Sequence, residues 1–179
     1  TNSYASGADS LAAAITNNTS SYGATGANSV ALGRFAKASS SDTFAVGLIS
    51  QATGSNSIAI GNSALATTNA IALRGDATAI AAIAIGFGSV ASGSESICIS
   101  SGSSNAGNAS GSRSIAFGAK SDASADYSVA IGFGATSSTF GKNSFASGWL
   151  GSAGDAQTGT MVLRSDTTDA TPEALTSNN

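Results

Sequence analysis

The sequence predicts an all-β solenoid built from repeats of about 14 residues. Segments 29–33, 43–47 and 57–61 read SVALG, TFAVG and SIAIG. The first apolar residue of each segment, which we call its opener, is Val30, Phe44 or Ile58, and these openers are evenly spaced. Even spacing of this kind is typical of stacked structural repeats. The chain has 22 Gly and 1 Pro, and no apolar face recurs with helical periodicity, which disfavours helices. Further openers follow at Ile71, Ile83, Ile97, Ile115, Val129 and Phe145, so the period holds with small deletions and insertions.

Each repeat contains two predicted strands. The first is an apolar-Ala-apolar triplet closed by Gly, and the second is a looser Ala-x-Ala pattern. The second pattern is found at residues 36–40, 64–68, 89–93, 107–111 and 121–125. Two strands of about five residues and two tight turns account for one repeat.

Neighbouring residues of a strand point to opposite faces, and a narrow two-stranded coil has room inside only for small side chains. We therefore expect the middle residues of the first strands to point inward: Ala31, Ala45, Ala59, Ala84, Ala116 and Ala130. Cys98 occupies the same position, so we interpret it as a buried small residue rather than a reactive thiol. As the single cysteine, it also excludes an intrachain disulfide.

The large residues that flank these alanines should then form a continuous apolar stripe on one outer face. Such a stripe predicts an interface, and self-association about a symmetry axis is its simplest form. The predicted interface residues are Val30, Leu32, Phe44, Val46, Ile58, Ile60, Ile83, Ile85, Ile97, Ile99, Ile115, Phe117, Val129 and Ile131. The opposite face should be solvated, with Lys37, Gln51, Thr67, Lys120 and Asp122 as outward residues of the second strand.

Several positions depart from the repeat. Arg74 stands where other repeats have the closing Gly; we expect a solvated or ion-paired residue, with an anion site as the alternative. Phe87 and Phe133 lie in two GFG segments and should pack at a corner between coils or subunits. Residues 101–105, in the longest repeat, should form a bulging loop. This loop and the surface of the second strands are the most accessible regions for binding a receptor, although no receptor-binding residue can be named.

The two ends of the chain fit the pattern poorly. Residues 1–27 are interpreted as degenerate repeats or an N-terminal cap, and the sequence does not define their register relative to the repeat. Residues 28–148 are interpreted as the repeat array. Residues 149–179 are a short C-terminal segment with one expected strand at 160–164, and we expect more chain to follow it. No signal peptide is visible, which suggests a fragment or processed chain.

Composition excludes several classes of function. The net charge is −3, with 7 basic and 10 acidic residues scattered singly, so a nucleic-acid interface is not expected. No apolar run reaches the roughly 18 residues of a membrane helix, so membrane insertion is not expected. Nothing in the sequence indicates a cofactor or a metal site.

The repeat resembles the head repeat of trimeric autotransporter adhesins, the YadA-like head, whose unit reads N-S-V-A-I-G followed by A-x-A-x-G. Residues 28–47, 56–68 and 127–141 carry this pattern. The resemblance covers about residues 28–148. It implies a left-handed parallel β-roll that is homotrimeric, with the first strands facing the axis.

The tail resembles a different group of proteins. Residues 154–175, GDAQTGTMVLRSDTTDATPEAL, look like a segment of bacteriophage tail and fibre proteins. This resemblance favours a virion attachment protein, a trimeric tail fibre segment that presents or spaces a surface binding a host receptor or glycan. Other virion tail proteins would be its partners. The alternative is the head of an adhesin on the bacterial outer-membrane surface.

Enzymatic function is not expected. Hexapeptide-repeat acyltransferases use a histidine base and longer coils of three strands, and this chain has no histidine. The close acidic pairs Asp122 with Asp126 and Asp166 with Asp169 fall in polar turns and should be solvated. The non-catalytic part of a polysaccharide-degrading tailspike remains an alternative. Calcium-binding and ice-binding solenoids are disfavoured, since Asp and Thr do not recur in every turn.

Overall fold

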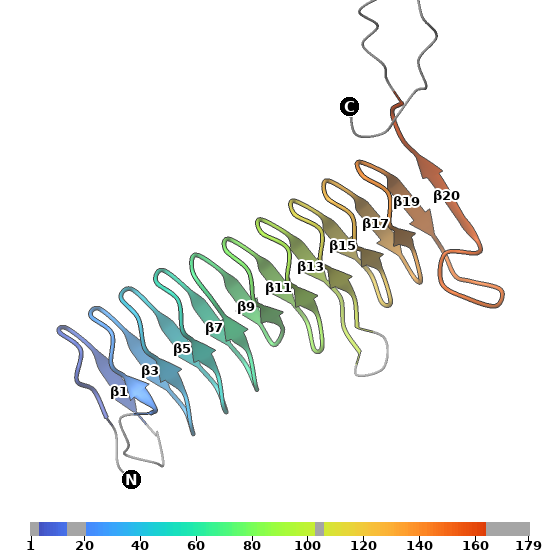
Figure 1. Ribbon diagram of the computed structural model, residues 1–179. Helices are drawn as coiled ribbons and strands as arrows, with labels where there is room; N and C mark the ends of the chain where they lie inside the picture. Colours follow the sequence, from blue (N-terminus) through green and yellow to red (C-terminus); the bar gives the residue numbers. More distant parts are fainter. Residues whose placement is uncertain (1–3, 14–20, 103–105, 164–179) are drawn as a thin grey trace, which may run out of the picture.

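The chain forms a rod of stacked coils (Figure 1). The computed structural model describes residues 4–13, 21–102 and 106–163. Within these residues the regular elements are all strands, and they form an eleven-stranded and a nine-stranded sheet. Every pair of strands is parallel except β19 with β20. The predicted all-β solenoid and the length of its repeat are confirmed.

The first sheet contains one strand from each coil. Its strands are β1 (Leu11–Ala13), β3 (Val30–Leu32), β5 (Phe44–Val46), β7 (Ile58–Ile60), β9 (Ile71–Leu73), β11 (Ile83–Ile85), β13 (Ile97–Ile99), β15 (Ile115–Phe117), β17 (Val129–Gly132), β19 (Asn143–Ala146) and β20 (Gln157–Thr160). The strands are three or four residues long, shorter than the five expected, because the turns take up more of each repeat.

The second sheet returns each coil to the next first strand. Its strands are β2 (Gly23–Ala24), β4 (Lys37–Ala38), β6 (Gln51–Ala52), β8 (Leu65–Ala66), β10 (Asp76–Ala77), β12 (Val90–Ala91), β14 (Asn108–Ala109), β16 (Asp122–Ala123) and β18 (Thr136–Ser137). The Ala-x-Ala pattern therefore marks these strands as predicted. Thr67 and Lys120, expected among their outward residues, instead lie in the turns, since the strands are only two residues long.

The core is a column of alanine and serine between the two sheets. In the β3 coil, Ser29, Ala31, Ala36 and Ala38 point inward and are fully buried. The six alanines expected inside are all fully buried, so the inference from alternation is confirmed. Cys98 takes the same place in the β13 coil and is also fully buried. Large side chains are therefore left for the outside.

Burial should make Cys98 unreactive in the folded protein. Desolvation raises the pKa of its thiol, which leaves little of the nucleophilic thiolate at neutral pH. We expect iodoacetamide to modify the native protein far more slowly than the urea-unfolded chain, as followed by mass spectrometry. Equal rates in the two states would contradict the buried position.

The Asn-Ser dipeptides that precede first strands serve the turns. Asn28 and Asn56 adopt left-handed backbone with φ of 54° and 57°, a conformation that asparagine tolerates better than most residues. Each following serine donates its Oγ hydrogen to the carbonyl three residues earlier: Ser29 to Gly26 and Ser57 to Gly54, both at 2.6 Å. The buried hydroxyl is thereby satisfied within its own turn.

The solenoid begins before residue 28. Leu11 pairs with Val30 and Ala13 with Leu32, while Gly23 of β2 pairs with Lys37. Residues 11–13 and 23–24 therefore occupy the regular positions of a coil, and the register that the sequence left open is defined. Residues 14–20 between them lie outside the described part.

The C-terminal end departs from the expected frame in two ways. Asn143, not Phe145, pairs with Val129, and Phe145 pairs with Ile131. The last opener was therefore misplaced by two residues, because a polar Asn fills the slot that the pattern reserves for an apolar residue. The expected strand at 160–164 is not found among the described residues: β20 ends at Thr160, which pairs with the first residue of β19, and residues 161–163 have no partner strand.

Asp155 fixes the turn that leads into β20. Its carboxylate accepts hydrogen bonds from the backbone N–H groups of Ser152, Gly151 and Leu150 at 2.8, 2.6 and 2.9 Å. These bonds, that of Ser152 first, lower the pKa of the carboxyl below its ordinary 3.8.

Because the pKa of Asp155 is lowered by folding, its carboxylate stabilises the folded turn fully above the ordinary pKa of 3.8. This stabilisation is lost as the pH falls through the lowered pKa. We expect amide exchange at Leu150, Gly151 and Ser152 to be protected down to pH 3.8 and to lose protection below it, relative to the intrinsic rates. The Asp155→Asn variant should lack this transition. A transition of equal size in that variant would contradict the assignment.

Candidate interaction surface

The outward side chains of the first sheet form two apolar columns. Parallel register aligns Phe44, Ile58 and Ile71 in one column and Val46, Ile60 and Leu73 in the other, and the alignment continues along the sheet. Ile58 is 37% exposed, Phe117 52% and Ile131 40%, although all three are large and apolar. The structure thus places all fourteen predicted interface residues on one face, which we call the apolar face.

The apolar face extends beyond the predicted residues. Ile71 and Leu73 of β9 lie in the same two columns, and Leu11 and Phe145 extend them to β1 and β19, where they are 56% and 58% exposed. Ile71 was recognised as an opener in the sequence, and the shortness of its repeat obscured that its strand is regular. The columns therefore run without a break across the β9 coil.

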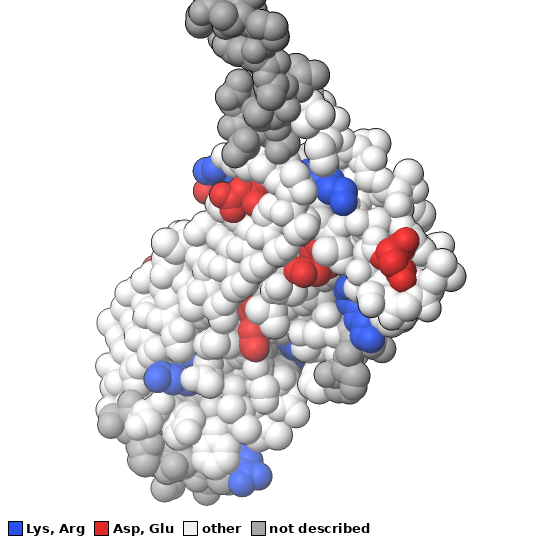
Figure 2. Space-filling model, turned by 45° about the vertical axis from the view of Figure 1, so that its right-hand side comes forward, with Lys and Arg blue, Asp and Glu red and all other residues white. Residues whose placement is uncertain are grey.

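No strand of the described first sheet carries a charged residue. The charged side chains of the described residues lie in turns, in the second sheet and in the segment before β20, and Figure 2 shows a few charged groups on the largely uncharged surface of one side of the molecule. A continuous apolar face without charges is unusual for a monomeric protein, since monomers rarely expose large apolar patches.

The outer row of the second sheet is mixed. From β4 to β18 it consists of Lys37, Gln51, Leu65, Asp76, Val90, Asn108, Asp122 and Thr136, one residue from each strand. Charged and polar residues interrupt the apolar ones, as expected for a solvated face. The two sheets of the rod therefore differ sharply in what they offer a partner.

Two hollows lie on the apolar face. One, of about 350 Å³, is bordered by Ile85, Ile99 and Phe117 beside the turn at Ser101. The other, of about 290 Å³, is bordered by Ile131 and Phe145 beside β20. Hollows of this kind receive the side chains of a partner at well-packed interfaces.

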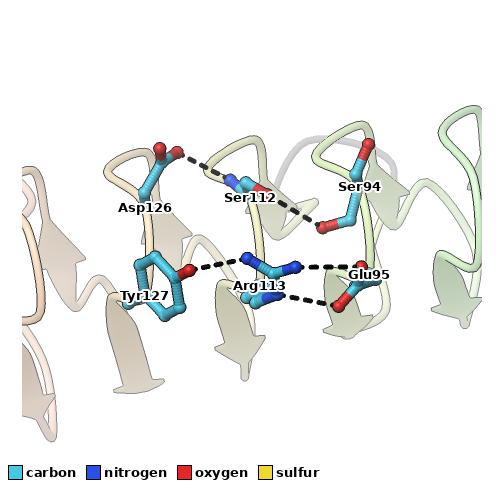
Figure 3. Close-up of polar contacts among 6 residues, drawn as sticks. All are labelled: Ser94, Glu95, Ser112, Arg113, Asp126 and Tyr127. Carbon is cyan, nitrogen blue, oxygen red and sulfur yellow. Dashed lines mark hydrogen bonds and ion pairs between the residues drawn. The ribbon is translucent and has the colours of Figure 1, made fainter.

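One corner of the rod carries a polar ladder across three coils (Figure 3). The Arg113 guanidinium donates to both carboxylate oxygens of Glu95 at 2.8 and 3.2 Å and to the Tyr127 hydroxyl at 2.6 Å. The bond to Glu95 is the main cause of the raised pKa of Arg113. Beside it, Ser112 N–H donates to Asp126 at 2.8 Å. The ladder links neighbouring turns, and its groups are occupied with one another rather than arranged around a substrate.

The GFG phenylalanines lie at the other corner. Phe133 stacks on Trp149 with 4.5 Å between ring centroids, and the Lys120 ammonium lies 4.3 Å from the Trp149 ring centre. Phe87 has the Arg74 guanidinium 5.4 Å from its ring centre and is 48% exposed. Both rings therefore pack against a side chain from a neighbouring turn, as predicted for a corner of the rod, and both stay partly exposed, Phe133 by 40%.

The acidic pairs show no catalytic arrangement in the part that the structure describes. Asp122 accepts from Asn108 at 3.2 Å and Asp126 from Ser112, so both act as structural acceptors. Asp166 and Asp169 lie outside the described residues. Among residues 4–13, 21–102 and 106–163, no three His, Cys, Asp or Glu side chains gather as metal ligands. The same residues include no helix that is long and apolar enough to span a membrane.

Comparison with known proteins agrees with this geometry. A family model described as "YadA head domain repeat (2 copies)" matches residues 24–48, 42–64, 52–73, 77–97 and 109–135, which together make up more than half of the chain. A search of curated proteins finds no match. The matched segments contain complete first and second strands of the central coils, such as β3 to β9, and the repeat of this family is a structural adhesin domain. The chain therefore belongs to the YadA head domain repeat family.

Proposed function

We propose that the chain is part of the head of a homotrimeric adhesin on a bacterial surface. It forms a rigid rod that presents or spaces a surface contacting host matrix or cells, and it performs no catalysis. The observation that carries the proposal is the charge-free apolar face on a chain of YadA head repeats. The fourteen predicted residues, with Ile71 and Leu73, would face the trimer axis. The second sheet and the turns would then face outward, toward a host receptor or glycan.

The division of the chain follows from this proposal. Residues 28–148 form the β-roll, with residues 1–27 as further repeats or a cap. Residues 149–179 form a separate C-terminal segment, which the family match does not reach. The antiparallel strand β20 supports that boundary, because it ends the parallel ladder of the first sheet.

A phage tail fibre segment is the second candidate, and the tail resemblance at residues 154–175 favours it. In that case the chain would belong to a virion, its partners would include other tail proteins, and its target would lie on a bacterial envelope. The two candidates share the trimeric rod and differ in the surface that it meets.

Binding to the two kinds of target tests the proposal. The fluorescently labelled chain is incubated with animal cells, with surfaces coated with extracellular matrix, and with intact bacteria of several envelope types. An adhesin head should bind cells or matrix, and heat-unfolded protein should not. Binding confined to bacterial envelopes would overturn the adhesin proposal in favour of the tail fibre, and release of sugar from those envelopes would indicate a tailspike.

A further inference from the structure

The β9 coil has a shortened turn at the corner that carries Phe87. Four residues connect the two strands of the β7 coil, 61–64, and four connect those of the β11 coil, 86–89. In the β9 coil only Arg74 and Gly75 do so. The strands themselves stay in register, since Leu73 pairs with Ile60 and Asp76 with Leu65. The two missing residues therefore leave a gap between the turns on either side.

This gap is a cavity of about 120 Å³, which we call the notch. It is lined by Asn62 and Ser63 from the turn of the β7 coil, by Phe87 and Gly88 from the turn of the β11 coil, and by Arg74, Gly75 and Asp76 of the short coil between them. The volume corresponds to about four water molecules at about 30 Å³ each. It therefore accepts one edge of a small ring with its substituents.

The side chains of the notch are held in place. The Arg74 stem lies against Gly61, where a Cβ would collide with Arg74 Cγ, and its guanidinium lies 5.4 Å from the Phe87 ring centre. The Ser63 hydroxyl donates to Asn62 Oδ1 at 2.9 Å, which fixes the amide. Asp76 is half-buried, and this burial raises the pKa of its carboxyl.

The chemistry of the notch is mixed. Arg74 and Asn62 supply hydrogen-bond donors, Asp76 supplies acceptors, and Phe87, a residue that is 48% exposed, supplies apolar surface. The Asp76 carboxylate opposes a simple anion, and the charged groups oppose a purely apolar ligand. A ligand with hydroxyl groups on one side and C–H groups on the other matches all of these groups.

We propose that the notch binds one sugar residue of a glycan. The C–H groups of the ring contact the exposed part of Phe87 beside the Arg74 guanidinium, and its hydroxyl groups donate to Asp76 and accept from Arg74 and Asn62. The inference deepens the proposed host-contact function and rests on it for its biological meaning. Its geometry lies at a corner of one chain and does not require the apolar face.

Saturation-transfer NMR on the whole chain tests the proposal. The probes are the methyl glycosides of glucose, galactose, mannose, N-acetylglucosamine and N-acetylneuraminic acid. For one small ring at an open site we expect dissociation constants on the order of 1 mM. At least one glycoside should receive saturation, and Phe87→Ala and Arg74→Gly should each reduce its signal by about tenfold, which corresponds to the loss of one good contact.

Two further variants keep the test independent of folding defects. Replacing residues 74–75 with the four residues 61–64 restores the regular turn and fills the notch, so it should fold normally and lose binding. Phe133→Ala alters the matching GFG segment, whose ring is stacked on Trp149 and borders no part of the notch, and should bind as the unaltered chain does.

Three results would overturn the proposal: no glycoside receives saturation, the filled notch still binds, or only the acidic sugar binds and sodium sulfate displaces it. The last would make the notch an anion site. None of these results bears on the assembly of the rod, which the mass of the protein in solution tests separately.

Discussion

The Ala59→Leu variant is expected to lose at least about 3 kcal/mol of unfolding free energy, the upper range for overpacked cores. Ala59 is fully buried, and its neighbours in the adjacent strands are Ala45 and Ala72. Those neighbours are about 4.8 Å away, the spacing of hydrogen-bonded strands. A leucine has no direction in which to turn, because the opposite wall of the coil is also alanine and serine.

Urea denaturation followed by circular dichroism measures this loss. Ser124→Leu is the matched control, since it adds a similar volume at an exposed turn position and should change stability by no more than about 0.5 kcal/mol. If Ala59→Leu were as stable as the control, the interior would have to contain space that the structure does not show.

The double variant Ile58→Glu, Ile60→Glu is expected to abolish assembly while leaving the coil folded. Both side chains lie on the apolar face and are 37% and 38% exposed in the single chain, so neither is needed for the interior. Full burial of an isoleucine contributes about 1.5–3 kcal/mol, so burying the part of these two side chains that is still exposed contributes roughly 1–2 kcal/mol per subunit. The glutamates would in addition place charges at a dry interface.

Sedimentation velocity checks this result, and circular dichroism confirms the fold. The variant should sediment as the 17.1 kDa chain at micromolar concentration. Gln51→Glu with Leu65→Glu, on the second sheet of neighbouring coils, is the control and should keep the assembled mass. Dissociation of the control, or assembly of the apolar-face variant, would place the interface elsewhere.

The sequence was sufficient to predict the coil because one physical constraint recurs in every repeat. An interior that admits only small side chains, namely alanine, serine, Thr43 and Cys98, forces the large residues outward, and alternation shows which ones they are. The predicted register was wrong at β19. Asn143 occupies a position that is apolar in the other repeats, so Phe145 was taken as the first apolar residue of this strand. The predicted position of the last strand differs from that of β20 because β20 pairs with β19, and the residues that pair cannot be read from the sequence.

The notch was hidden for a related reason. Arg74 was recognised as an exception to the closing glycine, and its repeat as short, but the sequence does not reveal where the missing residues fall. Strand register places them in one turn, between Ser63 and Phe87. A candidate site made by a deletion is visible only once the neighbouring coils are aligned.

We propose that the apolar face joins three copies of the chain, and multi-angle light scattering of the purified protein measures this assembly. The expected mass is three times the 17.1 kDa of one chain. A folded monomer of 17.1 kDa at micromolar concentration would contradict it, because the uncharged columns from Leu11 to Phe145 would then remain in water.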